Sequence, residues 1–158
     1  MTLSTADNEF ESQAQALGFD FNGKIKIGGN YAPVIQHGHE VYVSGQIPRI
    51  GDQVVVIGAA GAEVSLSQAQ LAAKICALRA LALLRNQLGS ISQIKQVLRI
   101  TVYVHSAHDF TQQSEVADGA SDILFRVLKE AGRHTRTSVG VAQLPKGATV
   151  ELDLIAAI

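Results

Sequence analysis

RTSVGVAQLPKGATVE, residues 136–151, contains two alternating runs that flank a turn. Val139 and Val141 alternate with small or polar residues, which is the period of a half-buried strand. Residues 144–147 have proline and glycine at the second and fourth positions, where β-turns favour them. The alternation restarts at Val150. We therefore predict a β-hairpin.

That hairpin would bring three polar side chains onto one face of a strand pair. A four-residue turn places Gly140 opposite Glu151, and directly paired residues share a face. Arg136, Ser138 and Glu151 would then point the same way. Two interpretations stay open. The face is solvated and carries a weak ion pair, or it is a ligand site in which the arginine binds a carboxylate bidentately and the glutamate orients or deprotonates a water.

The composition indicates one domain and argues against some partners. The chain has 158 residues, enough for a core of ordinary size. A formal net charge of -1 provides no field for nucleic acid or an anionic membrane. Charged residues make up 17% of the chain, against about 25% in average domains, so we expect part of the surface to lie between subunits. No apolar run reaches the roughly 20 residues of a membrane span.

The cysteine content and the N-terminal residues favour the cytoplasm. Cys76 is the one cysteine, so a reducing compartment is the default, and we interpret it as a small buried apolar residue. Asp7, Glu9 and Glu11 near the start, without a basic segment, are unlike a secretory signal or a transit peptide.

Residues 1–22 are expected to form a short helical appendage, and residues 23–158 a single domain. Phe10 and Ala14 recur at helical spacing in the appendage, and Gly18 ends the pattern. We assign no chemistry to this helix.

Apolar periodicity in the domain predicts two longer helices and a sheet. The first helix begins at Ser65 or Ser67, since Ser67 and Gln70 have capping-box spacing, and ends at Gly89. The second helix covers residues 112–131. An irregular strand and loop cover residues 24–38, and further strands cover residues 41–48, 54–57, 94–105, 136–142 and 149–156, the last well inside the sheet. In the strand 94–105, the residues assigned to one apolar face are Leu98, Ile100, Val102 and Val104. Two helices against one mixed sheet of about six strands make an α+β architecture.

Metal, nucleotide and serine-nucleophile chemistry are not indicated. Neither of two closely spaced histidine pairs has a third ligand at zinc spacing. The glycine-rich segments lack the lysine of a phosphate loop and the spacing of a dinucleotide fingerprint. Ser44 does not sit on the strand-to-helix elbow that exposes a nucleophilic serine. We expect no metal and no cofactor.

Two motifs resemble those of the YjgF/Rid family, also called endoribonuclease L-PSP-like. They are VYVSGQIP at residues 41–48 and R-x-S-V-x-V-x-x-L-P-x-G-A-x-V-E at residues 136–151, and Asp109-Phe110 also fits. The resemblance covers residues 31–158. It implies a chorismate-mutase-like fold and a homotrimer whose sheets form a barrel-like core, with helices outside and ligand sites between subunits.

The resemblance also implies an activity and roles for motif residues. Well-understood members hydrolyse reactive enamines and imines derived from amino acids to 2-keto acids and ammonia, without a cofactor. By motif, Arg136 would grip the substrate carboxylate and Glu151 would position the attacking water. Ser138 stands where active members commonly have a cysteine whose backbone carbonyl contacts that water.

The cleft itself would be lined by Tyr31 and by the corner Ser44, Gly45 and Gln46, supplied by a neighbouring subunit. The residue before Tyr31 is Asn30 instead of the family's proline, the second helix is longer, and the N-terminal segment is extra. These traits resemble a longer subgroup with no established substrate. Two alternatives to a deaminase therefore stay open: a non-catalytic binding protein for small carboxylates, and a ribonuclease or translation inhibitor, against which the near-neutral charge argues.

Overall fold

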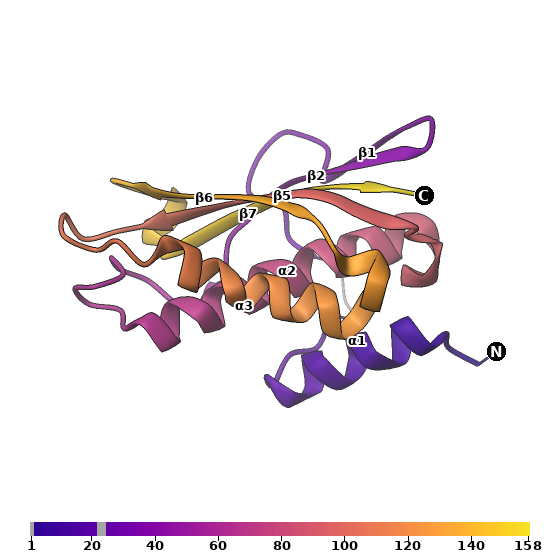
Figure 1. Cartoon of the computed structure of the whole chain (residues 1–158), viewed down its shortest axis with the longest axis horizontal. Coiled ribbons are helices and arrows are strands. Elements are labelled where there is room, and N and C mark those ends of the chain that lie inside the picture. Colours follow the sequence, from indigo (N-terminus) through magenta and orange to yellow (C-terminus); the bar gives the residue numbers. More distant parts are fainter. Residues whose placement is uncertain (1, 22–24) are drawn as a thin grey trace.

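A computed structural model describes residues 2–21 and 25–158, which form a sheet with helices layered against one face (Figure 1). The helices and strands in chain order are α1 (Thr5–Ala16), β1 (Val34–His37), β2 (Glu40–Gln46), β3 (Arg49–Ile50), β4 (Gln53–Val54), α2 (Leu66–Leu88), β5 (Gln96–His105), α3 (Gln113–Leu128), β6 (Thr135–Val141) and β7 (Val150–Ala157). Short 3-10 turns cover Ile91–Gln93, Lys129–Gly132 and Pro145–Gly147.

The sheet is mixed, as predicted. Its five strands run in the order β1-β2-β7-β5-β6, and β3 and β4 form a separate two-stranded ribbon. β6 is parallel to β5, and the other neighbours are antiparallel. The α+β class is therefore confirmed, and so is the prediction that the last strand lies inside the sheet.

The predicted hairpin is wrong, because β5 lies between β6 and β7. The chain runs from β5 through α3 to β6, and a strand-helix-strand crossover returns the second strand parallel to the first. Residues 142–149 then carry the chain past β5, so that β7 pairs with β5 on its other side. The turn at residues 144–147 exists as a 3-10 turn, but it joins strands that are not neighbours.

Strand register places Arg136 and Glu151 on opposite faces of the sheet. Arg136 pairs with Ile100, which also pairs with Leu154. Both apolar partners are buried, so Arg136 faces the helices. Glu151 pairs with Tyr103, three residues beyond Ile100 on β5, and a step of three residues reverses the face. The shared face predicted for the arginine and the glutamate is therefore wrong.

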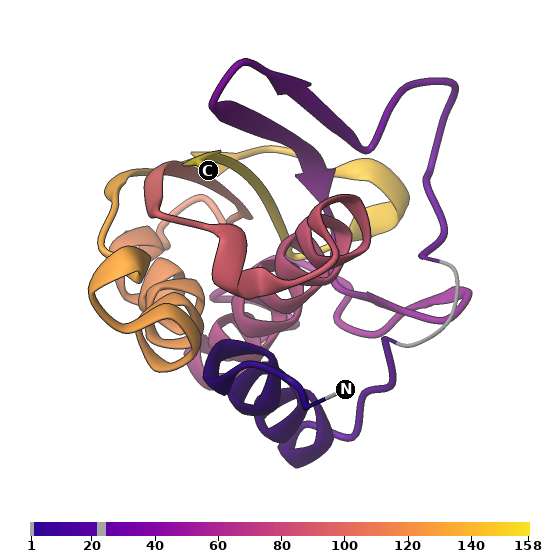
Figure 2. The same ribbon diagram turned by 90° about the vertical axis from the view of Figure 1, so that its right-hand side faces the viewer.

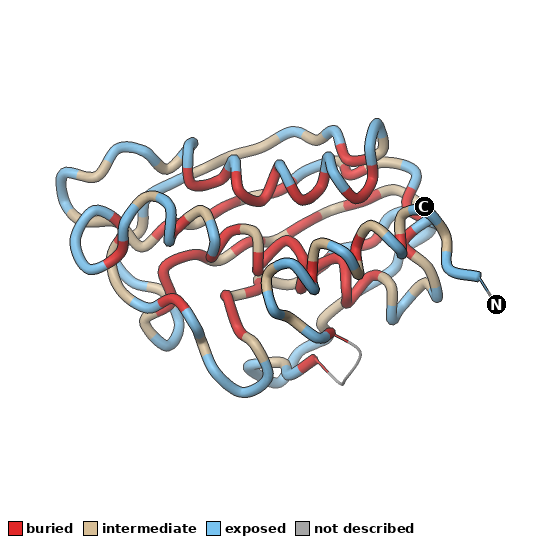
Figure 3. Tube along the Cα trace, turned by 90° about the horizontal axis from the view of Figure 1, so that it is seen from below, coloured by how far each residue is buried: buried red, intermediate tan, exposed pale blue. Residues whose placement is uncertain are grey.

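The core fills the space between the sheet and the helices, where buried residues line both layers (Figure 3). On β5 a register shift between Val97 and Arg99 changes the face of Leu98. Val97 takes the buried position expected for Leu98, whereas Ile100, Val102 and Val104 are buried as predicted.

Helix α2 begins at a capping box, which is made by Ser65 and Gln68 rather than by Ser67 and Gln70. The Ser65 hydroxyl accepts the Gln68 backbone N–H, and the Gln68 side chain accepts the Ser65 N–H, which satisfies two otherwise free donors. Gly89 ends the helix in the left-handed conformation, as predicted.

Helix α1 packs on the outer side of α2 and α3 (Figure 2). It buries Phe10 and Ala14, as the helical spacing indicates. Arg85 of α2 lies over the Phe10 ring, 4.4 Å from its centroid, and pairs with Glu11. No helix within residues 2–21 and 25–158 is long and apolar enough to span a membrane.

Candidate functional site

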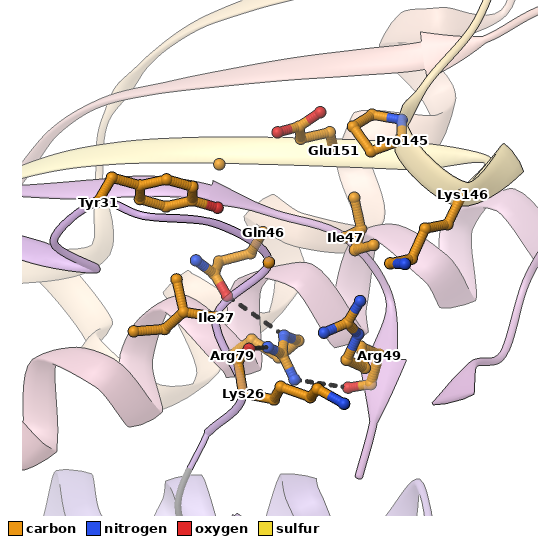
Figure 4. A pocket seen from close by; sticks show the side chains of 12 residues that line it. Lys26, Ile27, Tyr31, Gln46, Ile47, Arg49, Arg79, Pro145, Lys146 and Glu151 are labelled. Carbon is orange, nitrogen blue, oxygen red and sulfur yellow. Dashed lines mark hydrogen bonds between the residues drawn. The ribbon is translucent and has the colours of Figure 1, made fainter. Parts of the chain in front are cut away.

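A cavity of about 440 Å³ lies at the end of β2 (Figure 4). Its volume is within the range of small-molecule sites. Four of the residues predicted to form a site line it, namely Tyr31, Gly45, Gln46 and Glu151. All four belong to one chain, so the prediction that a neighbouring subunit brings Tyr31 and the corner to Glu151 is wrong.

A β-bulge creates the space for the carboxylate. The pairing of β2 with β7 shifts between Val43 and Gln46, and Gly45 lies within the shift. A Cβ at Gly45 would stand 2.1 Å from Oε1 of Glu151. The glycine therefore allows the carboxylate to lie against the strand, an arrangement that bulges beside functional sites permit.

The surroundings of Glu151 favour its neutral form. Burial raises the pKa of this half-buried carboxyl, and the nearby charge of Asp153 raises it further. Among the described residues, no lysine or arginine nitrogen lies within 4.0 Å of the carboxylate to offset these effects. A carboxyl with a raised pKa in a cavity is a candidate general base.

The floor of the cavity is held together by Arg79, a residue of α2 that we did not single out from the sequence. It donates to Oε1 of Gln46 at 3.3 Å, to the Arg49 carbonyl at 2.9 Å and to the Lys26 carbonyl at 3.0 Å. Burial lowers the pKa of this guanidinium. The sequence could have indicated this residue, since Arg79 is the one charged residue in the otherwise apolar segment 75–84.

A second unanticipated arginine, Arg49 of β3, lines the same cavity. Its side chain is buried, with 4% of its surface exposed, and its Nε has no hydrogen-bond partner among the described residues. In the sequence Arg49 directly follows Pro48, which favours a turn with a solvated arginine, so its burial could not be predicted from the sequence.

Ser44 does not line the cavity, but its hydrogen bonds hold the neighbouring corner at Gly45 and Gln46. Its hydroxyl donates to the Pro33 carbonyl at 3.3 Å, and its own carbonyl accepts the Gln46 side-chain amide at 2.9 Å. Ser44 therefore fixes Gln46 and, through it, one contact of Arg79.

Arg136 lies outside the cavity, bound to α3. It donates to Oδ1 of Asp118 at 2.9 Å and to Oγ of Ser121 at 2.9 Å, and its second amino group contacts the carbonyl and hydroxyl of Ser114. Ser138 pairs with a buried β5 residue and shares the helix-facing side of β6. Neither residue meets Glu151 within one chain.

A histidine extends the Arg136 network. Nε2 of His134 lies 2.9 Å from the Ser121 hydroxyl, and Nδ1 lies 2.6 Å from the Gly132 carbonyl. Burial lowers the pKa of His134, and the nearby Arg136 charge lowers it further. The neutral ring can then donate from Nδ1 to the carbonyl and accept the serine proton at Nε2, which leaves the serine oxygen free to accept from Arg136.

Other reactive groups are not poised for chemistry. Burial raises the pKa of the Cys76 thiol, which confirms its interpretation as a small apolar core residue. Within residues 2–21 and 25–158, no three histidine, cysteine, aspartate or glutamate side chains are grouped to hold a metal ion.

Comparison with known proteins identifies the family. The sequence model of the family described as "YjgF/chorismate_mutase-like, putative endoribonuclease" matches residues 11–157. The chain belongs to the YjgF family. This confirms the resemblance seen in the motifs and the chorismate-mutase-like fold.

Three known proteins are similar to this chain over nearly their whole length. Protein TCP17 of Trypanosoma cruzi is 37% identical over 151 residues, 95% of this chain and 94% of the relative. The crystal structure of Atu1372 from Agrobacterium tumefaciens, a protein of unknown function, has 37% identity and a TM-score of 0.85, covering 97% and 94% of the two chains. A Shewanella oneidensis MR-1 structure, called a putative endoribonuclease, has 29% identity and a TM-score of 0.86, covering 94% and 99%.

The polar residues predicted to form one site lie in two separate groups in this YjgF protein. The cavity holds Glu151 with Tyr31 and Gln46, and the network on β6 and α3 holds Arg136. Arg136 and Glu151 can serve one ligand only if a second subunit brings its Arg136 to this cavity.

Proposed function

We propose that this YjgF protein is a hydrolase that converts small carboxylate-bearing imines or enamines to 2-keto acids and ammonia. The observation that supports the proposal is the half-buried, unpaired Glu151 facing a small-molecule cavity with its pKa raised by burial. A carboxylate of raised pKa is suited to accept a proton from water near neutral pH.

The reaction needs one activated water and no redox step. Glu151 accepts a proton from the water as the water oxygen bonds to the imine carbon, and the C=N electron pair moves to nitrogen. Glu151 returns that proton to the nitrogen, which gives the carbinolamine. Glu151 then accepts the proton of the carbinolamine hydroxyl and passes it to the nitrogen, the O–H electron pair forms the C=O bond as the C–N bond breaks, and ammonia leaves with a 2-keto acid as the second product. Tyr31, with its hydroxyl in the same cavity, is suited to orient the substrate.

The proposal includes a homotrimer, since the face of the sheet away from the helices is partly apolar. Ile35 pairs with Tyr42, which pairs with Ile155 across the uncovered face. Ile35 is 54% exposed, Tyr42 41% and Val139 39%. Packing such faces together would bury this surface. β6 is an edge strand, so Arg136 lies near the rim of the sheet, which supports a contact with a neighbour's cavity in such a trimer.

A non-catalytic binding protein for small carboxylates is the second candidate. The observation that favours it is the ion pair between Arg136 and Asp118, because an arginine already held by a carboxylate is a weaker ligand for a substrate. The same cavity would then hold an acid without turning it over.

A nuclease is a weaker candidate, although the family description names one. The net charge of -1 provides little attraction for a polyanion. Robust RNA cleavage that a Glu151 substitution abolishes would reverse this ranking.

The deciding experiment is an assay of ammonia and keto-acid formation from freshly generated 2-iminopropanoate and 2-iminobutanoate. We expect acceleration over buffer by the wild type and its loss in Glu151→Gln. Arg126→Gln, on the exposed side of α3, is the control for altered charge. Keto-acid binding without acceleration would leave the binding protein as the function. Light scattering on the same sample tests the trimer, and a stable monomer would exclude the contribution of a neighbour's Arg136.

A further inference from the structure

We infer that the floor of this cavity binds a second acidic group on the ligand, with Arg49 as the cation that contacts it. This inference deepens the proposed function and rests on it. It narrows the substrate class from 2-imino acids in general to 2-imino acids that carry a further carboxylate.

Arg49 is the observation that points to a ligand. Only 4% of the surface of Arg49 is exposed, yet the residue lines the cavity. Its Nε has no hydrogen-bond partner and its guanidinium forms no ion pair within the described part of the chain. A buried charge without a partner is costly, so such groups are normally paired. A bound carboxylate would supply the missing acceptor.

Arg79 adds a second buried charge beneath the first. Its three hydrogen bonds go to a side-chain amide and two backbone carbonyls, all uncharged, and no carboxylate pairs with it among the described residues. One of these carbonyls belongs to Arg49 itself, so Arg79 fixes the Arg49 backbone and acts as a positioning residue. Its charge also makes the floor more attractive to an anion.

The other charged side chains that line the cavity are also mostly cationic. Lys26 and Lys146 line it with the two arginines, and Glu151 is the one carboxylate among the lining residues. Lys26 is partly neutralised by Asp52, 2.9 Å away at the exposed rim. Even so, this concentration of cations contrasts with a chain whose net charge is -1.

The two arginines and the carboxylate lie on different walls of the cavity. Glu151 and Pro145 lie along β7 and the turn before it, whereas Arg49 and Arg79 lie on the opposite side, with Ile47 between them (Figure 4). A ligand with its imine carbon beside Glu151 would therefore direct its far end toward Arg49. A guanidinium binds a carboxylate through two parallel hydrogen bonds. The far end of the ligand is therefore a carboxylate.

The test compares two keto acids that differ only at the far end. We would titrate 2-oxoglutarate and 2-oxopentanoate, each with five carbons, into the wild type by calorimetry. The expected result is binding of 2-oxoglutarate at least about tenfold tighter, as a charge-assisted bidentate contact provides. In Arg49→Met the preference should fall to within about twofold, while the affinity for 2-oxopentanoate stays unchanged.

Controls keep a misfolded variant from imitating this result. Arg126→Gln removes a charge outside the cavity and should retain the preference, and Lys146→Gln should reduce it without abolishing it. Arg49→Met should unfold at no lower a temperature than the wild type, since it removes an unpaired buried charge.

The other outcomes overturn the inference. They are equal binding of the two acids, no binding of 2-oxoglutarate at millimolar concentration, a preference that survives Arg49→Met, and an equal loss of both acids in that variant. The equal loss would make Arg49 the main carboxylate ligand instead of a second one. Absence of imine hydrolysis with the preference intact would instead refute only the hydrolase, so the two failures are distinguishable.

Discussion

The carboxylate of Glu151 lies against the backbone of Gly45 so closely that a Cβ on residue 45 would be 2.1 Å from Oε1. The two residues come from β2 and β7, and they meet where a bulge interrupts the pairing of these strands. The position of the candidate base therefore depends on the absence of one side chain on a neighbouring strand.

Replacement of Gly45 by alanine should displace Glu151 and reduce imine hydrolysis by about a hundredfold, the loss that a misplacement of roughly 1 Å can cause. Gly28→Ala is the matched control in the same cavity, because a Cβ there would lie 3.9 Å from the Tyr31 hydroxyl, an ordinary contact. Steady-state kinetics on the two variants measures the difference. Equal activity in both would show that the carboxylate position is not critical.

The pH dependence of hydrolysis should report the raised pKa of Glu151. The base is active when deprotonated, so kcat/KM should fall as the pH decreases through that pKa. Burial raises this pKa and the charge of Asp153 raises it further. Asp153→Asn should therefore move the acid limb to lower pH without returning it to the position of an ordinary glutamate. An unmoved limb would assign it to another group.

How much of the fold can be predicted from the sequence depends on how far apart in the chain the interacting residues are. The helices and most strands were predicted because their apolar periods are local. The pairing of β6 was not, because the turn chemistry of residues 144–147 suggested a hairpin, whereas the order of β5, α3 and β6 sets a parallel crossover. The face of Leu98 was also predicted wrongly, because the alternation of apolar residues in the sequence does not show the register shift on β5.

The candidate site was predicted in part for a related reason. Tyr31, Gly45, Gln46 and Glu151 were found through motifs, and the structure brings them together. Arg49 was missed because it is buried only in the folded chain, where it lines the cavity with residues from distant parts of the sequence. Sequence spacing alone cannot show that a turn arginine is enclosed.

Asp7 should anchor helix α1, and its replacement by asparagine should reduce the free energy of unfolding by about 1–3 kcal/mol. Its carboxylate accepts hydrogen bonds from the Ser4 and Ser90 hydroxyls and the Ile91 N–H. Burial alone would raise the pKa of Asp7, but these hydrogen bonds, with the charge of Arg85, lower it below its ordinary value.

The sign of the pH effect follows from that lowered pKa. The stabilisation by Asp7 is fully present above the unfolded pKa, about 3.9, and is lost as the pH falls through the lower folded value. Denaturant unfolding at about pH 7 and about pH 3 should therefore show a smaller difference between wild type and Asp7→Asn in acid. Glu9→Gln, on the same helix, should change the unfolding free energy by less than about 0.5 kcal/mol. A pH-independent difference would mean that the charge is not what anchors the helix.

Two substitutions that change keto-acid binding in opposite directions test the role of Arg136. Arg136→Ala should weaken binding of 2-oxobutanoate by about 2 kcal/mol, roughly thirtyfold, if a neighbouring subunit brings this arginine to the cavity. Asp118→Asn removes the carboxylate that lies 2.9 Å from the guanidinium, so it should free the arginine and tighten binding. Calorimetry measures both, with Arg126→Gln as the control for altered charge on α3. If Asp118→Asn weakens binding or has no effect, the ion pair is a structural tie between β6 and α3, and the carboxylate ligand must be sought among the cations of the cavity.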